Sequence, residues 1–245
     1  MLTDMDALKA LWQEAFDDPP DFTELFFREG FSPDRHMYVE QNGQLAGALY
    51  WFDCQWQDKK LAYIYGVAVA KQFRGQGLSR LLMEKTHNHL HENGYHGAVL
   101  VPAEVGLFSM YEKLGYQGFC PMERKTVLPG IPAVVKELGK RKYAALRRKC
   151  LPENGILQEG VALDFLAGYN RFYAGDKCLF AASQEENTLY IQEFLGNVEQ
   201  LPGVVAALGA KSTKVRLPGG SKPFAMYLGF TEECQIPSYF GIALD

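Results

Sequence analysis

The feature that most constrains this chain is a glycine-rich turn between a strand-like run and a helical pattern. Residues 61–70 are apolar and rich in Tyr, Ile and Val, which predicts a buried strand. Helical spacing begins at Leu78 and stops at Asn93-Gly94, a pair typical of helix C-termini. Between the two patterns the chain reads Gln72-Phe73-Arg74-Gly75-Gln76-Gly77. A strand that passes directly into a helix in this way indicates a fold with both helices and a sheet.

This turn is suited to bind a pyrophosphate. Gly75 and Gly77 can adopt positive φ and let a ligand approach the backbone, so that amides at the helix N-terminus face the anion. Arg74 can add a charge-assisted contact. A P-loop is excluded because Leu78-Ser79 follow, and a dinucleotide fingerprint is excluded because Arg80 stands where a small residue is needed. Glycines that serve packing alone are the structural alternative.

The rest of the first half alternates helical and strand patterns. Helical spacing occurs over residues 8–16, 22–29 and 108–114, and strand patterns occur over 36–40, 45–51, 98–101 and 116–127. Asn42-Gly43 predicts a tight hairpin between the first two strands.

Two motifs, in this order, resemble the GNAT N-acetyltransferase superfamily. Gln72, Gly75 and Gly77 match its Gln/Arg-x-x-Gly-x-Gly/Ala signature, and Tyr-Glu-Lys-Leu-Gly-Tyr at 111–116 matches its Tyr-Glu-Lys-x-Gly-Phe/Tyr ending. The resemblance covers about residues 1–128 and implies an α/β (α+β) fold, a GNAT-like mixed central sheet flanked by helices. The first strand of the family looks truncated or absent, because this chain starts almost in its first helix.

The resemblance implies an acetyl-CoA site and assigns residues to it. The pantetheine arm would lie in a gap between two splayed strands, against the backbone of Val67, Ala68 and Val69. The pyrophosphate would lie on the amides of residues 74–79. Together with these three residues, the resemblance therefore assigns the residues of the signature and of the turn to cofactor binding: Gln72, Arg74, Gly75, Gln76, Gly77, Leu78 and Ser79.

Tyr111 would be the general acid that protonates the departing CoA thiolate. A phenol suits this role, since a thiolate formed in a low-dielectric cleft needs a nearby proton donor. The structural alternative is an amphipathic tyrosine packed on one helix face.

The general base is not assigned by a motif. An alkylammonium, with a pKa of about 10.4, must lose a proton before it can attack. The strand before the signature, where family members often carry a glutamate, has Tyr63 and Tyr65 and no carboxylate. Glu104, which stands where many members have an asparagine, or a water held by Tyr65, are the candidates. Glu104 is equally placed to cap the following helix, which we favour.

Acidic and aromatic residues cluster where the family lines its acceptor cleft. Acids outnumber the single base Arg28 here, which favours a cationic acceptor such as a polyamine, an aminoglycoside or a protein lysine; a solvated helix face explains them as well. The aromatic residues are typical of core, and an apolar acceptor pocket is the alternative. These two sets are Asp17, Asp18, Asp21, Glu24 and Glu29, and Phe22, Phe26, Phe27 and Phe31.

Composition narrows the class of protein further. The formal charge of −4 argues against generic binding of nucleic acid or anionic membranes. The longest apolar run is ten residues, far below the roughly 20 of a membrane span, and the N-terminus lacks a secretory pattern. Five scattered cysteines without a CxxC pair predict reduced thiols and a cytoplasmic location. His87, His89 and His91 are expected to be solvated, and no metal site is predicted.

The second half resembles a degenerate copy of the first. Pro129-Gly130 predicts a boundary between an acetyl-CoA-binding catalytic domain at 1–130 and a degenerate GNAT-like domain at 131–245. Residues 224–230 repeat the Phe-x-Met-Tyr and Leu-Gly-aromatic pattern of 108–116, which predicts a second short helix. The corresponding turn, 196–200, has one glycine and adds Glu199, a carboxylate that would repel a pyrophosphate. Residues 136–149 predict a helix with a basic outer face, and a nucleic-acid patch is the alternative.

These observations predict a GNAT-type N-acetyltransferase that uses acetyl-CoA as co-substrate and no metal. The acceptor would be a small-molecule or peptide amine that attacks directly in a ternary complex. Direct transfer is favoured because the one cysteine near the motifs, Cys120, has no histidine partner in view. A non-catalytic acetyl-CoA sensor or scaffold is the main alternative, and a GNAT-like fold without a cofactor is the third. The second domain would wall off the acceptor cleft or form a homodimer surface.

Overall fold

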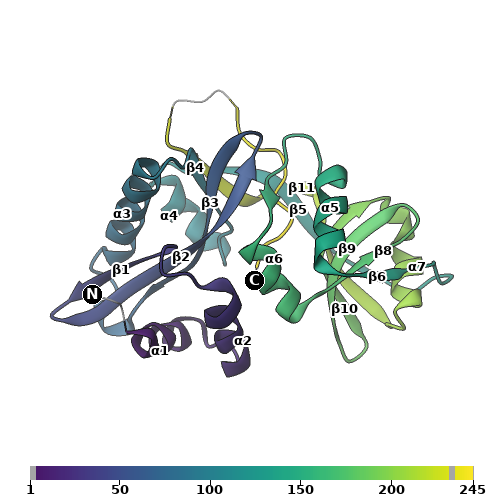
Figure 1. Ribbon diagram of the computed structural model, residues 1–245, viewed down its shortest axis with the longest axis horizontal. Helices are drawn as coiled ribbons and strands as arrows, with labels where there is room; N and C mark the ends of the chain where they lie inside the picture. The colour runs from purple at the N-terminus through teal and green to yellow at the C-terminus, as the bar shows by residue number, and fades with distance from the viewer. Residues whose placement is uncertain (1–3, 232–234, 245) are drawn as a thin grey trace.

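The computed structural model describes residues 4–231 and 235–244. Figure 1 shows an elongated molecule with an N-terminal lobe on the left and a C-terminal lobe on the right, and the described chain ends between them. One mixed sheet runs through both lobes in the order β1-β2-β3-β4-β11-β10-β9-β8-β6, with β5 paired to β11 and β7 to β2. The predicted fold class, a mixed sheet flanked by helices, is confirmed.

The N-terminal lobe contains the helices and strands that the sequence predicts. Its elements are α1 (Met5–Phe16), α2 (Pro20–Leu25) with a π turn (Phe26–Gly30), β1 (His36–Gln41), β2 (Gln44–Trp56), β3 (Lys59–Val69), α3 (Leu78–Glu92), β4 (Gly97–Leu100), α4 (Phe108–Glu112) and β5 (Gln117–Val127). Asn42 and Gly43 both have positive φ, 55° and 73°, and close the predicted hairpin between β1 and β2.

The C-terminal lobe adds a second group of antiparallel strands followed by a parallel pair. Strand β10 pairs with β9 antiparallel and with β11 parallel, and α7 connects β10 to β11 as α3 connects β3 to β4. The elements are β6 (Lys136–Leu138), α5 (Lys140–Cys150), β7 (Leu157–Gln158), α6 (Val161–Tyr169), β8 (Arg171–Ala174), β9 (Cys178–Glu185), β10 (Thr188–Gly196), α7 (Leu201–Ala207) and β11 (Ser212–Gly229).

Strand β11 joins the two lobes. Its first residues, 212–215, pair with β10, its last residues, 226–229, pair with β4, and almost its whole length pairs with β5. The predicted helix at 224–227 is therefore wrong. These residues have strand partners on both edges, Phe119 and Gly118 on β5 and Leu100 on β4, and their buried side chains pack in the sheet. Tertiary pairing overrides the local resemblance to the helix at 108–112.

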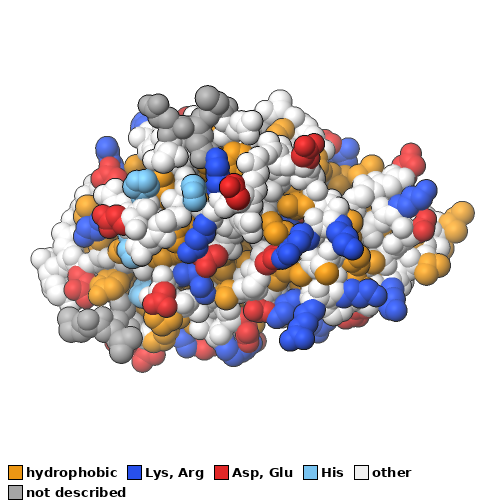
Figure 2. All heavy atoms as spheres, turned by 45° about the horizontal axis from the view of Figure 1, so that its top comes forward, with side chains coloured by type: hydrophobic (Ala, Val, Ile, Leu, Met, Phe, Trp, Pro, Cys, Tyr) orange, Lys and Arg blue, Asp and Glu red, His pale blue; other side chains and the backbone are white. Residues whose placement is uncertain are grey.

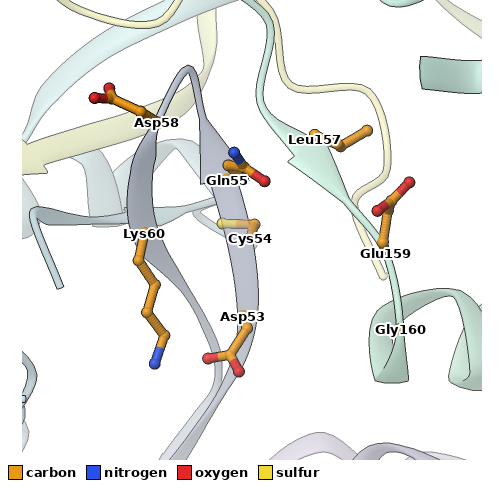
Figure 3. Close-up of a pocket in the computed structure, with 8 residues that line it drawn as sticks. All are labelled: Asp53, Cys54, Gln55, Asp58, Lys60, Leu157, Glu159 and Gly160. Carbon is orange, nitrogen blue, oxygen red and sulfur yellow. The ribbon is translucent and has the colours of Figure 1, made fainter. Parts of the chain in front are cut away.

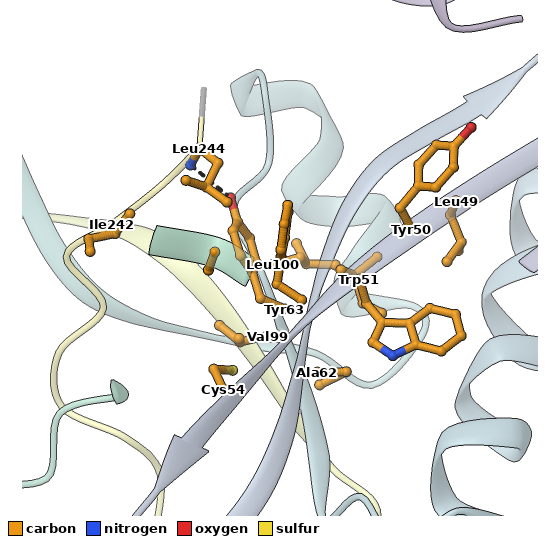
Figure 4. Close-up of a cluster of buried hydrophobic side chains, with 14 of the residues drawn as sticks. Leu49, Tyr50, Trp51, Cys54, Ala62, Tyr63, Val99, Leu100, Ile242 and Leu244 are labelled. Carbon is orange, nitrogen blue, oxygen red and sulfur yellow. Dashed lines mark hydrogen bonds between the residues drawn. The ribbon is translucent and has the colours of Figure 1, made fainter. Parts of the chain in front are cut away.

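The main hydrophobic core extends from the N-terminal lobe into the C-terminal lobe, and a second cluster of buried apolar side chains lies within the C-terminal lobe. Figure 4 shows side chains of β2, β3 and β4 packed together, with Ile242 and Leu244 of the C-terminal segment among them. The backbone N–H of Leu244 donates to the Tyr63 hydroxyl at 3.2 Å. Trp51 and Phe52 are at most 2 % exposed. The C-terminal segment is thus packed against the sheet of the N-terminal lobe.

A buried ion pair anchors that segment in the C-terminal lobe. Arg147 on α5 donates from Nε and Nη2 to the carboxylate of Glu193 on β10 at 2.6 and 2.9 Å. Tyr143 and Tyr239 donate to the same carboxylate, and both charged side chains are fully buried. Arg147 does not belong to the basic outer face expected for 136–149, because Glu193 pairs with it inside the core.

The remaining bases of α5 are exposed, as the sequence predicts. They are Lys140, Arg141, Lys142, Arg148 and Lys149. Figure 2 shows lysine and arginine side chains gathered on the right-hand lobe. None of the described helices combines the length and the apolar character that a membrane crossing would require.

Candidate active site

The site begins where β3 and β4 separate. The two strands pair in parallel only from Leu61 to Tyr63, opposite Gly97 to Val99. Past that point β3 bulges, since its register against β2 shifts between Ala48 and Tyr50 and Gly66 has φ of 60°. A Cβ atom at Gly66 would lie 2.6 Å from the Trp12 ring, so a side chain there would collide with it. The bulge and the splay open the sheet at this edge.

A cavity of about 720 Å³ lies at this opening. Among the residues that the sequence singles out, it brings together Val67 and Tyr65 from β3, Glu104 from the loop after β4, and Tyr111 from α4. Three aromatic side chains from other elements form part of its apolar wall, namely Trp12, Phe22 and Phe224. A large apolar cavity with a few convergent polar groups is the usual form of a small-molecule site.

Tyr111 is well placed to hold a proton. Its side chain is 6 % exposed, and burial raises the pKa of its phenol to about 12. The ring packs edge-on against Tyr116, whose hydroxyl lies 2.9 Å from Nε2 of His87. The phenol is therefore protonated at neutral pH and fixed at the cavity wall.

Glu104 does not cap a helix. It precedes a short 3₁₀ turn, Val105–Leu107, but its side chain makes no capping hydrogen bond, so the favoured cap role is wrong. The residue is exposed and lines the cavity. Its carboxylate is thus available on the same cavity as Tyr111.

The glycine turn has the open geometry that anion binding needs. Gly75 and Gly77 have φ of 78° and 77°, and a Cβ built on either would meet no atom within 4 Å. Among the described residues, no hydrogen bond occupies the amides of residues 75–80. A helix N-terminus with open amides and positive-φ glycines can hold phosphate oxygens.

Side chains around the turn hold it in place. Arg74 donates from Nε to the Val69 carbonyl at 3.0 Å, and Gln76 accepts from Gln41 at 2.9 Å. Gln72 donates to Gln44 at 3.1 Å. These bonds fix the turn to the end of β3 and to the β1–β2 hairpin.

The other residues of the predicted cofactor set lie on β3 or at the start of α3. Ala68 is buried, Val69 is half-buried on β3, and Leu78 and Ser79 are half-buried in the first turn of α3. Gln72 lines a separate cavity of about 580 Å³ between α1 and the hairpin. Contact of these residues with acetyl-CoA stays a prediction.

One acid of the predicted acceptor cluster lines the cavity. Asp18 accepts from Trp12 Nε1 at 2.9 Å, and burial raises the pKa of its carboxyl. Asp17, Asp21, Glu24 and Glu29 do not line it, and Glu24 instead pairs with Lys9. Phe22 faces the cavity, whereas Phe26 and Phe27 are core residues and Phe31 packs against the core.

Sequence reasoning missed an entire wall of the cavity. Residues of β5, β11 and the C-terminal segment complete it, among them Arg124, Arg216, Lys222, Phe224 and Leu244. No local pattern marks them, because their position depends on β11 passing from one lobe into the other.

Two of the three histidines of α3, His87 and His89, differ from the expectation. His87 is not solvated, since it packs against Tyr116 and Phe230, and burial lowers its pKa to about 4. His91 is exposed and His89 is partly buried against Trp51. Within residues 4–231 and 235–244 no group of three potential ligands is arranged to hold a metal ion.

A further pocket contains none of the predicted site residues. Figure 3 shows it between the β2–β3 hairpin and β7, with Asp53, Asp58 and Lys60 on one side and Glu159 on the other. Its volume is about 370 Å³. We therefore take the cavity at the β3–β4 splay as the candidate site.

Comparison with known proteins gives a family-model match over the first half of the chain and solved structures with a similar fold. Residues 2–119 match the family model described as an acetyltransferase (GNAT) domain. A GCN5-related N-acetyltransferase of Anabaena variabilis aligns over 93% of this chain and 71% of its own, with TM-score 0.72 and 14% identity. The corresponding protein of Kribbella flavida covers 93% and 69%, with TM-score 0.68 and 15% identity. A Pyrococcus horikoshii protein covers 98% and 90%, with TM-score 0.64 and 14% identity. No curated protein matches the chain in sequence. At these identities the structures show a shared fold.

Proposed function

We propose that this chain, whose residues 2–119 match a GNAT acetyltransferase domain, transfers acetyl from acetyl-CoA to an amine in a ternary complex. The observation that carries the proposal is the presence of three parts around β3: a turn with open amides after the strand, a splayed β3–β4 edge, and a buried phenol on the cavity at that edge.

Different parts of acetyl-CoA would bind to the glycine turn and to the cavity. The Arg74 amide donates to the Lys71 carbonyl at 3.3 Å, so the open amides of residues 75–79 would hold the pyrophosphate, at the positive end of α3. The unpaired edge of β3 past Tyr63, with Val67 at the cavity, would hold the pantetheine arm. The thioester would then lie in the cavity, where Tyr111 and Glu104 are.

The proposed reaction balances with two proton transfers. The neutral amine nitrogen attacks the thioester carbonyl carbon, a C–N bond forms, and the C–S bond breaks. The CoA thiolate takes the proton of the Tyr111 phenol. The raised pKa of this phenol means that it is protonated when the C–S bond breaks. The nitrogen gives up a proton to a base, and Glu104 or a water held by Tyr65 are the groups on this cavity that can take it.

The C-terminal lobe would serve the same site. We propose that it is a degenerate copy of the first domain, because both units contain antiparallel strands followed by a helix-connected parallel pair. It would complete the acceptor side, since Arg216, Lys222 and Phe224 line the cavity.

Amine-dependent release of CoA tests the proposal. Purified protein with acetyl-CoA and a panel of primary amines should release thiol, and Tyr111→Phe should slow turnover by about 100-fold or more with acetyl-CoA affinity unchanged. Tyr227→Phe, which alters a buried tyrosine outside the cavity in the analogous sequence motif, is the matched control and should retain the rate. Tight binding of acetyl-CoA without thiol release for any amine would instead indicate a sensor or scaffold, and full activity of Tyr111→Phe would remove the general-acid role.

A further inference from the structure

The wall that β11 contributes to the cavity carries a primary amine. Lys222, Pro223 and Phe224 are consecutive on this strand, and all three line the cavity. Among the described residues of the lining, Lys222 is the one lysine. Tyr111 and Glu104, the groups proposed to move protons in the acetyl transfer, line the same cavity. An amine of the chain itself therefore shares the space in which the thioester would lie.

A bulge of β11 brings this lysine to the cavity. The register of β11 against β5 shifts between Pro218 and Pro223, so residues 219–222 lie outside the ladder. Gly219 has φ of 152°, and a Cβ atom there would lie 2.8 Å from Oε1 of Glu123 on β5. The proline rings at both ends restrict the backbone further. The base of the bulge is thus fixed on β5, and the flexible lysine side chain extends from it.

The Lys222 amine is not committed to another group of the chain. The residue is exposed, and within residues 4–231 and 235–244 its side chain makes no hydrogen bond and no ion pair. The two arginines of the lining differ in this respect, because Arg124 and Arg216 both have interactions within the chain. The guanidinium of Arg216, for example, lies 4.7 Å from the centroid of the Phe224 ring. Of these three cations, Lys222 is the one whose charged group is free to approach a bound thioester.

We propose that Lys222 is a site of self-acetylation, at which the chain transfers acetyl from its own bound acetyl-CoA to its own amine. The inference rests on the proposed acetyl transfer and adds to it a modification site on the protein. The modification replaces an ammonium on the acceptor side of the cavity by a bulkier, uncharged acetamide.

The step balances in atoms and protons. The Lys222 ammonium gives one proton to Glu104 or to a water held by Tyr65, and the neutral Nζ attacks the thioester carbonyl carbon. A C–N bond forms, the C–S bond breaks, and the CoA thiolate takes the proton of the Tyr111 phenol. The nitrogen then gives up a second proton, which restores the phenol, while the first proton passes to solvent. The products are CoA and an acetamide on Nζ.

Mass spectrometry of the purified protein incubated with isotope-labelled acetyl-CoA, without any added amine, tests this inference. Lys222 lies in the tryptic peptide 217–245, which contains no other lysine and no arginine, and trypsin does not cleave before Pro223. Modified and unmodified forms are therefore read from one peptide. Lys222 should be labelled about 10-fold or more faster than Lys142, an exposed lysine of α5 outside the cavity, because the thioester is held beside it. The labelling rate per chain should not depend on protein concentration.

Two variants and an unfolded control separate transfer in the cavity from chemical acetylation. Tyr111→Phe should slow the labelling of Lys222 by about 10-fold or more, because the thiolate loses its proton donor, and should leave that of Lys142 unchanged. Lys222→Arg should remove the label from peptide 217–245, which excludes transfer to a hydroxyl or thiol group of that peptide. Protein unfolded in guanidinium chloride should label both lysines at equal rates.

Other outcomes contradict the inference in distinguishable ways. Equal labelling of Lys222 and Lys142 in the folded protein, a labelling rate per chain that rises with protein concentration, or undiminished labelling in Tyr111→Phe would overturn self-acetylation. An unlabelled Lys222 in protein that releases thiol with added amines would reject it and leave the proposed function intact. Absence of acetyl-CoA binding would reject the proposed function itself.

Discussion

The two strand–helix–strand units of this molecule share a topology but differ at the turn. In the first unit β3 leads through Gly75 and Gly77 into α3, and in the second β10 leads through Gly196 into α7. The amides of the first turn are open. In the second, Asn197 caps the short 3₁₀ turn by accepting from the Glu199 amide at 3.0 Å, and a Cβ at Gly196 would lie 2.2 Å from the Lys177 carbonyl oxygen.

In both units the two parallel strands separate, but a cavity lies at the separation in the first unit and the C-terminal segment lies there in the second. Strand β3 leaves β4 after Tyr63, and a cavity lies there. Strand β10 leaves β11 after Ile191, and the next two residues, Gln192 and Glu193, contact the C-terminal segment at Ala243 and Tyr239. The comparison teaches that topology alone does not make a ligand site. The same unit is a candidate site where turn and splay are open, and a structural element where the chain's own groups fill them.

Breaking the buried ion pair should have the largest effect, and it should affect stability rather than binding. Arg147→Met leaves the Glu193 carboxylate buried without its cation, which costs about 3–5 kcal/mol of unfolding free energy. Urea unfolding measures the loss. Acetyl-CoA affinity of the folded variant should stay within about threefold, because the pair lies in the second unit. The double variant Arg147→Met/Glu193→Leu should recover part of the stability, and a single variant as stable as wild type would contradict the structural role.

Closing the first turn should weaken ligand binding rather than reduce stability. Gly75→Leu places a side chain over the open amides and should weaken acetyl-CoA binding about 100-fold or more by calorimetry. Gly209→Leu is a matched control, since Gly209 follows α7 with φ of 70° and no atom within 4 Å of its Cβ position. Both substitutions carry a similar backbone strain of about 1–2 kcal/mol. Equal affinity in the two variants would show that the turn does not hold the ligand.

Mild acid should loosen the first unit before the second. His87 of α3 has a pKa of about 4 in the folded protein, below its ordinary value, so the unfolded state binds more protons as pH falls from 6.5 to 4. Its contribution to stability is complete above the unfolded pKa and is lost on acidification, on the order of 2 kcal/mol. Residues 201–207 of α7 contain no ionisable side chain.

Hydrogen exchange at pH 7 and pH 4.5 measures this difference. Amides of α3 should lose more protection than those of α7, and His87→Gln should reduce that loss. His91→Gln, at an exposed site on the same helix, should leave it unchanged. Equal loss of protection in both helices would remove His87 as the cause.

Removing the cap of the second turn should have the smallest effect. Asn197→Ala deletes the side-chain oxygen that accepts from Glu199 N–H and should cost about 1 kcal/mol of stability. Urea unfolding measures it, with acetyl-CoA titration as the second readout. The variant should gain no second binding site, because Glu199 and the close contacts of Gly196 remain. A second binding site in this variant would mean that the Asn197 cap alone prevents the second turn from binding acetyl-CoA.

Local patterns in the sequence were sufficient for the first unit and its turn. The hairpin at Asn42-Gly43, the strand before Gly75 and the helix from Leu78 depend on neighbouring residues, and each is present as predicted. The fold class was implied by the family resemblance that the motifs at 72–77 and 111–116 carry, and it is confirmed. The placement of Tyr111 on the cavity agrees with the motif that singled it out.

Long-range contacts decided the rest. Residues 224–227 repeat the pattern of a helix but form a strand, because β4 and β5 supply hydrogen-bond partners on both edges. Arg147 reads as one base of a basic helix, and its burial depends on Glu193, 46 residues away. Arg216 reaches the cavity through the course of β11 between the lobes. None of these contacts has a local signature.

The central claim, that only the first unit binds acetyl-CoA, is tested most directly by titration of the wild-type protein with acetyl-CoA in a calorimeter. The account predicts one site per chain, with Kd of about 1–100 µM, in the range of typical substrate affinities. Two sites per chain, or none, would contradict it.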